Sequence, residues 1–233
     1  MQAIKQQRRD SLQDVWYQFA MTSSISSNWA FDRLRLYTAN TNTKVGLFNA
    51  SGGANTDAQG RTVLNTVDLI VQQPFHSGEG WTSADYEHDF TFDLSTIGGN
   101  LKVAISGVPT GADFTQVYSN PTGYGSTRGK DADISFWYFG GCNPTDYLRL
   151  ENQPLYYIYL DNSNIVKALH VRVDGTNLYN THLDKLLIGL NNNGKSNGTL
   201  NYSGRTVTVG GRVAYDNLIS KGWTITGTPP PIS

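Results

Sequence analysis

Residues 183–227 read LDKLLIGLNNNGKSNGTLNYSGRTVTVGGRVAYDNLISKGWTITG, and the pattern of this stretch decides the fold that we expect. Segments with the apolar spacing of a helix alternate with short strand-like segments, and each helical segment ends at a glycine-containing turn. The four segments, in chain order, are 183–190, 198–204, 213–220 and 223–227. The unit repeats after about 24 residues, which predicts stacked coils of one strand and one helix.

A single coil of this kind cannot bury its own apolar side, so neighbouring coils must share a core. We expect Trp223 to close that core, and the three prolines at 229–231 to stop the sheet because proline cannot extend a ladder. The residues predicted to form the shared core are Leu186, Leu187, Leu190, Leu200, Leu218, Ile219 and Ile225.

A weaker recurrence precedes this stretch. Strand-like cores lie at 134–138, 148–150, 158–160 and 171–173. Alternate members are about 23 residues apart, which predicts a coil with one strand on each of two faces.

The closing stretch resembles the last repeats of leucine-rich-repeat surface proteins from gut and gliding bacteria and their phages. The sequence segments that match are Leu183-Asp184, Asn193-Gly194 and the runs 196–204 and 217–225. The resemblance covers roughly a fifth of the chain, or about two fifths with the repeats from residue 134. It implies a parallel β-solenoid used for adhesion or assembly, and it brings no catalytic motif.

The fold class that we predict is mainly β, in three parts. Residues 1–21 are expected to form an amphipathic helix that packs on its own domain or docks on a neighbouring subunit, because Ile4, Leu12, Val15, Trp16 and Phe19 lie near one helical face. Residues 22–130 are expected to form a β-rich domain, and residues 131–233 a leucine-rich-repeat-like solenoid with its cap. The strands expected in the middle part are 31–37, 44–48, 62–72, 90–94 and 101–105, the last two as a hairpin-like or coil-like pair.

Composition narrows the function classes. Only 16% of the 233 residues are charged, against about 25% in an average domain, and the formal net charge is −1. This charge gives no electrostatic footprint for nucleic acid. The single cysteine, Cys142, excludes an intrachain disulfide and is interpreted as a buried thiol. No stretch approaches the length of a membrane span and no signal peptide is visible, so we expect assembly into a particle inside the cell.

Candidate chemical groups match no known motif. The cluster His76, Glu79, Asp85, Glu87, His88 and Asp89 lacks the spacing of a helical zinc site and is interpreted as a polar loop with a strand that starts at His88. The asparagine-rich runs 161–164 and 191–194 lack the terminal acidic ligand of a calcium loop and are interpreted as turns between coils. We predict no catalytic, cofactor-binding or metal-binding residues.

These observations favour a non-enzymatic phage virion protein, such as a spike, fibre or capsid-associated subunit, in assembly or host attachment. It would form a homo-oligomer, contact other virion subunits and bind a host surface glycan or protein. The candidate interface residues are Trp16, Phe19, Tyr156, Tyr157 and Tyr159, because aromatic side chains anchor interfaces and sugars. The alternatives are a bacterial cell-surface adhesin or glycan-binding module, and a glycan hydrolase, whose two carboxylates need no sequence signature.

Overall fold

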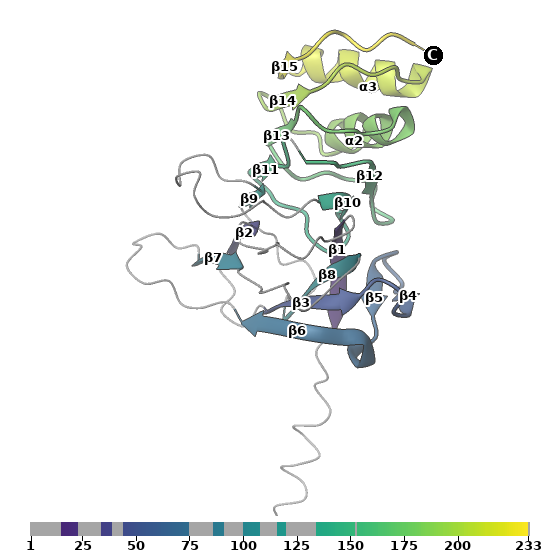
Figure 1. Cartoon of the computed structure of the whole chain (residues 1–233). Coiled ribbons are helices and arrows are strands. Elements are labelled where there is room, and N and C mark those ends of the chain that lie inside the picture. The colour runs from purple at the N-terminus through teal and green to yellow at the C-terminus, as the bar shows by residue number, and fades with distance from the viewer. Residues whose placement is uncertain are drawn as a thin grey trace, which may run out of the picture.

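A computed structural model of the chain describes residues 15–22, 34–38, 44–74, 86–90, 100–107, 116–119, 134–151 and 153–232. The described fold is mainly β, with two α-helices, α2 (Asn180–Asn192) and α3 (Val209–Ser220), near the C-terminus (Figure 1). The mainly β class and the positions of the two C-terminal helices therefore agree with the prediction.

The strands form two sheets. The first sheet has eight strands: β1 (Trp16–Thr22), β3 (Lys44–Asn49), β4 (Ala54–Thr56), β5 (Thr62–Leu64), β6 (Leu69–Pro74), β8 (Leu101–Ser106), β10 (Ile134–Tyr138) and β12 (Tyr157–Tyr159). The second sheet has seven: β2 (Leu34–Thr38), β7 (Tyr86–Phe90), β9 (Gln116–Ser119), β11 (Tyr147–Arg149), β13 (His170–Val173), β14 (Thr199–Tyr202) and β15 (Thr224–Thr226). The order is β12-β10-β1-β8-β3-β6 in the first sheet and β15-β14-β13-β11-β9-β2-β7 in the second.

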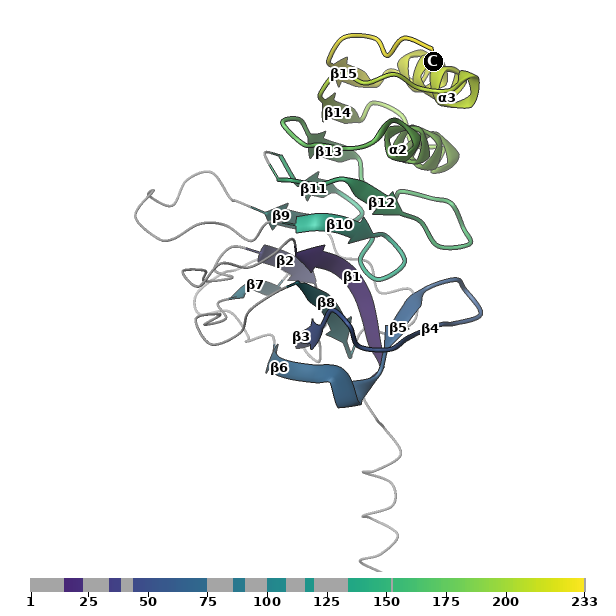
Figure 2. The same cartoon turned by 45° about the vertical axis from the view of Figure 1, so that its right-hand side comes forward.

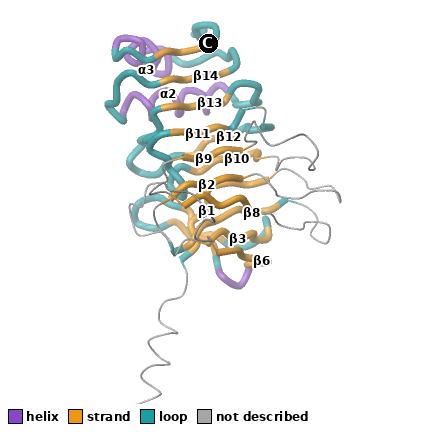
Figure 3. The backbone as a smooth tube through the Cα atoms, turned by 90° about the vertical axis from the view of Figure 1, so that its left-hand side faces the viewer, coloured by secondary structure: helices purple, strands orange, loops and turns teal. Residues whose placement is uncertain are grey.

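The pairing is antiparallel in the early part of the chain and parallel in the late part. From β10 to β13 the chain alternates between the two sheets, and β14 and β15 then follow in the second sheet. The pairs β10–β12, β11–β13, β13–β14 and β14–β15 are all parallel. Phe136 pairs with Tyr157 in the first sheet, and Tyr147 pairs with His170 in the second. The expected recurrence of about 23 residues is confirmed by these two registers. Figure 3 shows the strands stacked as successive rungs.

The helices take over from the strands of the first sheet where the coils become longer. Beyond β12, α2 and then α3 occupy the side of the stack opposite β14 and β15 (Figure 2). α2 is helical because its leucines recur at helical spacing, and all of Leu183, Leu186, Leu187 and Leu190 are buried.

The start of α3 is fixed by α2. The backbone N–H of Thr208 donates to the Asp184 carboxylate at 3.1 Å, and the Thr208 hydroxyl accepts from Gly211 N–H at 3.3 Å. A carboxylate at a helix N-terminus is favourable because it faces the positive end of the helix dipole. Asp184 thus sets the position of the last helix on the one before it.

One hydrophobic cluster runs through the whole stack, from Phe19 to Trp223. In its lower part Phe19 packs edge-on against Trp137, with ring centroids 5.4 Å apart. Both sheets run across residue 130, since β1 pairs with β10 and β9 pairs with β11. The proposed division of the chain into parts at that residue stays a prediction.

The helix expected over residues 1–21 is wrong in its second part. Residues 16–22 form β1, an interior strand between β8 and β10, and residues 1–14 lie outside the described part of the chain. The register of β1 against β8 shifts between Gln18 and Ala20. Trp16 and Phe19 are both buried, but in two separate hydrophobic clusters, so two apolar residues three positions apart in a strand imitate the spacing of a helix.

Three further expectations concern two strand regions and one core residue. The strand expected at 62–72 is divided into β5 and β6 by a 3-10 turn, η1 (Thr66–Asp68). Of the pair expected at 90–94 and 101–105, β8 forms the second strand, whereas residues 91–94 lie outside the described residues, so the choice between a hairpin-like and a coil-like pair stays a prediction. Of the predicted shared core, Ile219 is 46% exposed and was assigned wrongly, because it lies on the outer side of the last helix.

Candidate functional site

A row of aromatic side chains covers the outward side of β10 and β12. Phe136 stacks on Tyr157 with centroids 4.6 Å apart, and Tyr138 stacks on Tyr159 with centroids 4.7 Å apart. The parallel register places these residues side by side. Strand alternation sends Trp137 into the core and leaves its two neighbours facing outward.

Tyr179, at the N-terminus of α2, extends the row. It is 49% exposed and meets the Tyr157 ring in a T-shaped contact at 5.1 Å. Tyr156 lies 5.8 Å from Tyr179 in a tilted arrangement. We call the set Phe136, Tyr138, Tyr156, Tyr157, Tyr159 and Tyr179 the tyrosine face.

The stacked rings cover each other's faces, so most of the tyrosine face presents ring edges and hydroxyls. The Tyr157 hydroxyl shares a hydrogen bond with Tyr179, which raises the pKa of Tyr157. Burial, with a smaller effect of Tyr159, raises the pKa of Tyr138 to about 12. Both phenols therefore keep their protons at neutral pH and can donate hydrogen bonds.

α2 borders the tyrosine face with two basic side chains. His182 is 8% exposed and meets the rings of Tyr157 and Tyr159 edge-on, at 5.1 and 5.6 Å. Its Nδ1 lies 2.8 Å from the carbonyl oxygen of Ile158, and burial lowers the pKa of His182. Lys185 is exposed, and its Nζ lies 5.3 Å from the centroid of the Tyr159 ring. Among the described residues no carboxylate forms an ion pair with Lys185.

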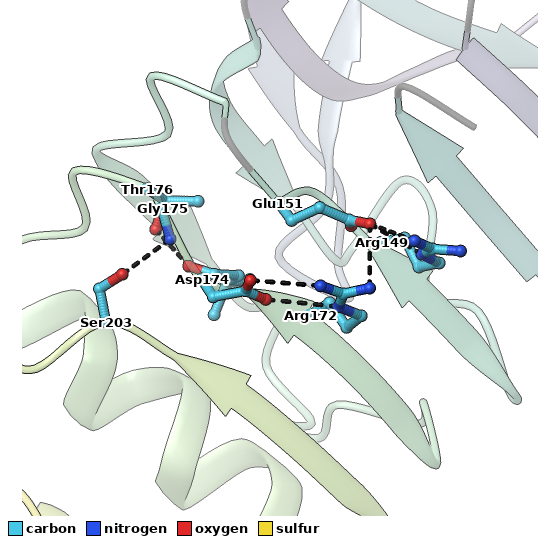
Figure 4. Close-up of polar contacts among 8 residues, drawn as sticks. Arg149, Glu151, Arg172, Asp174, Gly175, Thr176 and Ser203 are labelled. Atoms are coloured by element: carbon cyan, nitrogen blue, oxygen red, sulfur yellow. Dashed lines mark hydrogen bonds and ion pairs between the residues drawn. The ribbon is translucent and has the colours of Figure 1, made fainter. Parts of the chain in front are cut away.

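The second sheet carries a charged cluster at the ends of β11 and β13 (Figure 4). The carboxylate oxygen Oε1 of Glu151 accepts from Arg149 Nε at 2.9 Å and lies 3.6 Å from Arg172 Nη1. Arg172 also pairs with Asp174 at 3.3 Å. Glu151 is 3% exposed, and its second oxygen has no hydrogen-bond partner among the described residues. The cluster balances two positive charges against two negative ones and joins two successive coils.

The neighbouring positions of the second sheet continue these links. Tyr147 stacks on His170 at 4.6 Å, and His170 Nδ1 lies 3.0 Å from the Thr199 hydroxyl. Between the same two coils, just after β13 and β14, the backbone N–H of Gly175 donates to the hydroxyl of Ser203 at 2.7 Å (Figure 4). Side chains on this sheet therefore bond from rung to rung.

The corner that precedes the second sheet has its own ladder of bonds. Lys195 Nζ donates to the carbonyl oxygens of Thr145 and Lys167, both at 2.8 Å, and Trp223 Nε1 donates to the Lys195 carbonyl at 2.9 Å. These contacts connect four coils through one lysine.

The asparagine-rich runs 161–164 and 191–194 also bond between coils. Asn192 Nδ2 donates to the Asn164 carbonyl at 3.1 Å, and Lys221 Nζ donates to Asn191 at 2.8 Å. In the described ranges no group of three or more His, Cys, Asp or Glu side chains could hold a metal ion. The run 161–164 contains a turn, as interpreted, whereas Asn191 and Asn192 are the last residues of α2, so the run 191–194 leaves the helix only at Asn193.

The structure brings three of the five candidate interface residues together. Tyr156, Tyr157 and Tyr159 belong to the tyrosine face, whereas Trp16 and Phe19 are 1% and 0% exposed in the core, away from any surface. The sequence reasoning missed Phe136, Tyr138, Tyr179 and Lys185 as members of the same surface. The signal that could have found the first two is the parallel register that places residue 136 beside residue 157.

The remaining candidate residues do not form part of a described site. His76, Glu79 and Asp85 lie outside the described residues, and Glu87, His88 and Asp89 belong to β7, whose side chains are not described. Cys142 is buried, as expected.

Comparison with protein-family models, with curated proteins and with solved structures found no significant match to the chain. Neither helix in the described part of the chain has the length and apolar character needed to cross a membrane.

Proposed function

We propose that the chain is a non-enzymatic attachment protein, carried as a subunit of a virion, that binds its ligand through the tyrosine face. The observation that carries the proposal is the outward row of stacked tyrosines on β10 and β12. Tyrosine combines a large apolar ring with a polar hydroxyl, which suits both sugar ligands and protein interfaces. Because the rings are fixed on in-register strands, binding costs little side-chain entropy.

The architecture that we propose for the late part of the chain is a leucine-rich-repeat-like solenoid. It is supported by the parallel ladders from β10 to β15 and by helices that replace the strands of one side. Bonds such as those of Lys195 and Glu151 join the coils and make the stack rigid. A rigid stack is a suitable mount for a surface that must keep its geometry outside the cell.

The second candidate is a bacterial surface adhesin. The tyrosine face supports it equally, because binding through this face does not depend on a virion. Mass spectrometry of purified virions against cell-envelope fractions distinguishes the two. We expect the chain in virions at a fixed copy number. Its absence from virions and presence in the envelope would replace the first proposal by the second.

The role of the tyrosine face is tested on the purified chain. We expect the double variant Tyr156→Ala/Tyr179→Ala to lose binding to whole bacterial cells and to their extracted surface polysaccharide. Tyr147→Ala is the matched control, since it removes a stacked tyrosine from the second sheet. Equal binding by both variants and the unaltered chain would remove the tyrosine face from the proposal.

A further inference from the structure

We propose that the tyrosine face binds an acidic oligosaccharide, with Tyr179 stacking on a sugar ring and Lys185 pairing with a sugar carboxylate. This inference rests on the proposed attachment function and names the ligand class of the same face.

The geometry provides a continuous row for a short linear ligand. Tyr179 lies 5.1 Å from Tyr157, Tyr157 lies 6.3 Å from Tyr159, and Lys185 Nζ lies 5.3 Å from Tyr159. Only the first ring is largely exposed, so stacking is concentrated at that end of the row. The middle of the row offers phenol hydroxyls, which can donate to and accept from sugar hydroxyls.

The positive charge of Lys185 beside the tyrosine face favours an anionic ligand. Lys185 is exposed and is held over an aromatic ring, a contact that leaves the ammonium group open to a further partner. No described carboxylate pairs with it, in contrast to Arg149, Arg172 and Arg212, which all pair with acids. His182 has a lowered pKa and is neutral at pH 7, so the lysine is the charge that a ligand meets beside these rings.

The size of the surface favours an oligosaccharide over a folded protein. Five of the six side chains are mostly buried and Tyr179 is 49% exposed, so their combined exposed area is on the order of 500 Å². A stable protein partner needs about 800 Å² on each side. A ligand of a few sugar units matches the smaller area and the linear arrangement of the groups.

The experiment is titration calorimetry of the full chain with acidic oligosaccharides, sialylated and uronate-containing, and with their carboxyl-reduced neutral forms. We expect the acidic form to bind about tenfold more tightly than its reduced counterpart. Lys185→Gln should remove that difference, and Lys185→Arg should retain it. Tyr179→Ala should weaken both forms about tenfold, because it removes the stacking ring.

Two matched controls separate the face from the rest of the chain. Lys167→Gln removes a lysine from the corner of the stack, and Tyr147→Ala removes a stacked tyrosine from the second sheet. Both should bind like the unaltered chain. Circular dichroism and thermal unfolding of every variant show whether it is folded. If Lys185→Gln does not fold, the binding of Lys185→Arg to the acidic and reduced forms still provides a test.

The outcomes distinguish this inference from the attachment function. Equal affinity for acidic and reduced forms would overturn the acidic ligand while leaving the tyrosine face as the binding surface. Stronger binding of a phosphodiester-containing glycan would overturn the carboxylate assignment. A dimer in sedimentation that Tyr179→Ala dissociates would show a second copy on this face and overturn the inference. If Tyr179→Ala bound both cells and sugars as tightly as the unaltered chain, both proposals would be overturned.

Discussion

The buried carboxylate of Glu151 lies 3.6 Å from Nη1 of Arg172, which belongs to the following coil. The same oxygen accepts from Arg149, and the two arginines are direct neighbours in the parallel register. Like charges side by side on adjacent strands are unfavourable, so the shared carboxylate is what allows both arginines to face outward.

We therefore expect Glu151→Gln to destabilise the fold by about 2 kcal/mol, since it removes the buried charge that both guanidiniums share. The loss should shrink as salt is added, because salt screens the repulsion between the arginines. Urea unfolding at low and high salt measures both effects. Asp216→Asn is the control: it breaks the exposed pair with Arg212 and should cost under about 0.5 kcal/mol. A salt-independent loss would contradict the explanation.

The lowered pKa of His182 makes the stability of the fold depend on pH. Its pKa is lowered in the folded state by burial among Tyr157, Tyr159 and the first turn of α2, with a smaller effect of Lys185. A histidine with a lowered folded-state pKa binds more protons when unfolded, so its contribution to stability is present above the ordinary histidine pKa of 6.5. That contribution is lost as the pH falls through the lower, folded-state pKa.

The measurement is the urea midpoint between pH 7.5 and 5, for the unaltered chain and for His182→Gln. We expect the difference in stability between the two chains to decrease as the pH falls below 6.5. Carboxylates titrate in both chains and cancel in this difference. A constant difference over the whole range would show that His182 does not supply the pH dependence.

Two adjacent glycines at the start of α3 should respond in opposite ways to alanine. A Cβ on Gly211 would lie 2.8 Å from Cγ of Asp184, whereas a Cβ on Gly210 would meet nothing closer than 3.7 Å. Alanine usually stabilises a helix by about 1 kcal/mol relative to glycine. We expect Gly210→Ala to be neutral or stabilising, and Gly211→Ala to destabilise because it displaces the carboxylate that caps the helix. Thermal unfolding of the two variants provides the comparison, and equal shifts would contradict it.

Lys195 should matter for stability, in contrast to Lys185. Lys195→Met leaves two backbone carbonyls of other coils without their donor, at a cost of about 1–2 kcal/mol. Lys185→Met removes an exposed ammonium and should change stability by less than about 0.5 kcal/mol. Urea unfolding of both variants tests the difference. Similar losses in the two variants would mean that the corner ladder is not a significant source of stability.

The late part of the chain could be predicted because its signals are local. The leucines of α2 recur at helical spacing, and Leu200 and Ile225 occupy matching positions in neighbouring coils. Ile219 was misassigned because apolar character alone does not reveal which side of the last helix lacks a neighbour.

The early part could not be predicted in the same way because its order depends on distant residues. Trp16 and Phe19 give β1 the apolar spacing of a helix although they are buried in separate clusters, and only the pairing with β8 and β10 reveals a strand. The tyrosine face has the same origin. Tyr156, Tyr157 and Tyr159 could be selected as aromatic neighbours in the sequence, but Tyr138 and Lys185 join them only through strand pairing and the placement of α2.

The pairing of β1 with β10 has a consequence for how the chain folds. Ala20 pairs with Trp137 across most of the first half of the chain, whereas the coils beyond β10 pair with near neighbours in sequence. Closing a long loop costs more entropy than closing a short one, and contacts distant in sequence form more slowly. We therefore expect the coils beyond β10 to nucleate locally and propagate rung by rung, and β1 to insert into the first sheet late, as the slow step of folding.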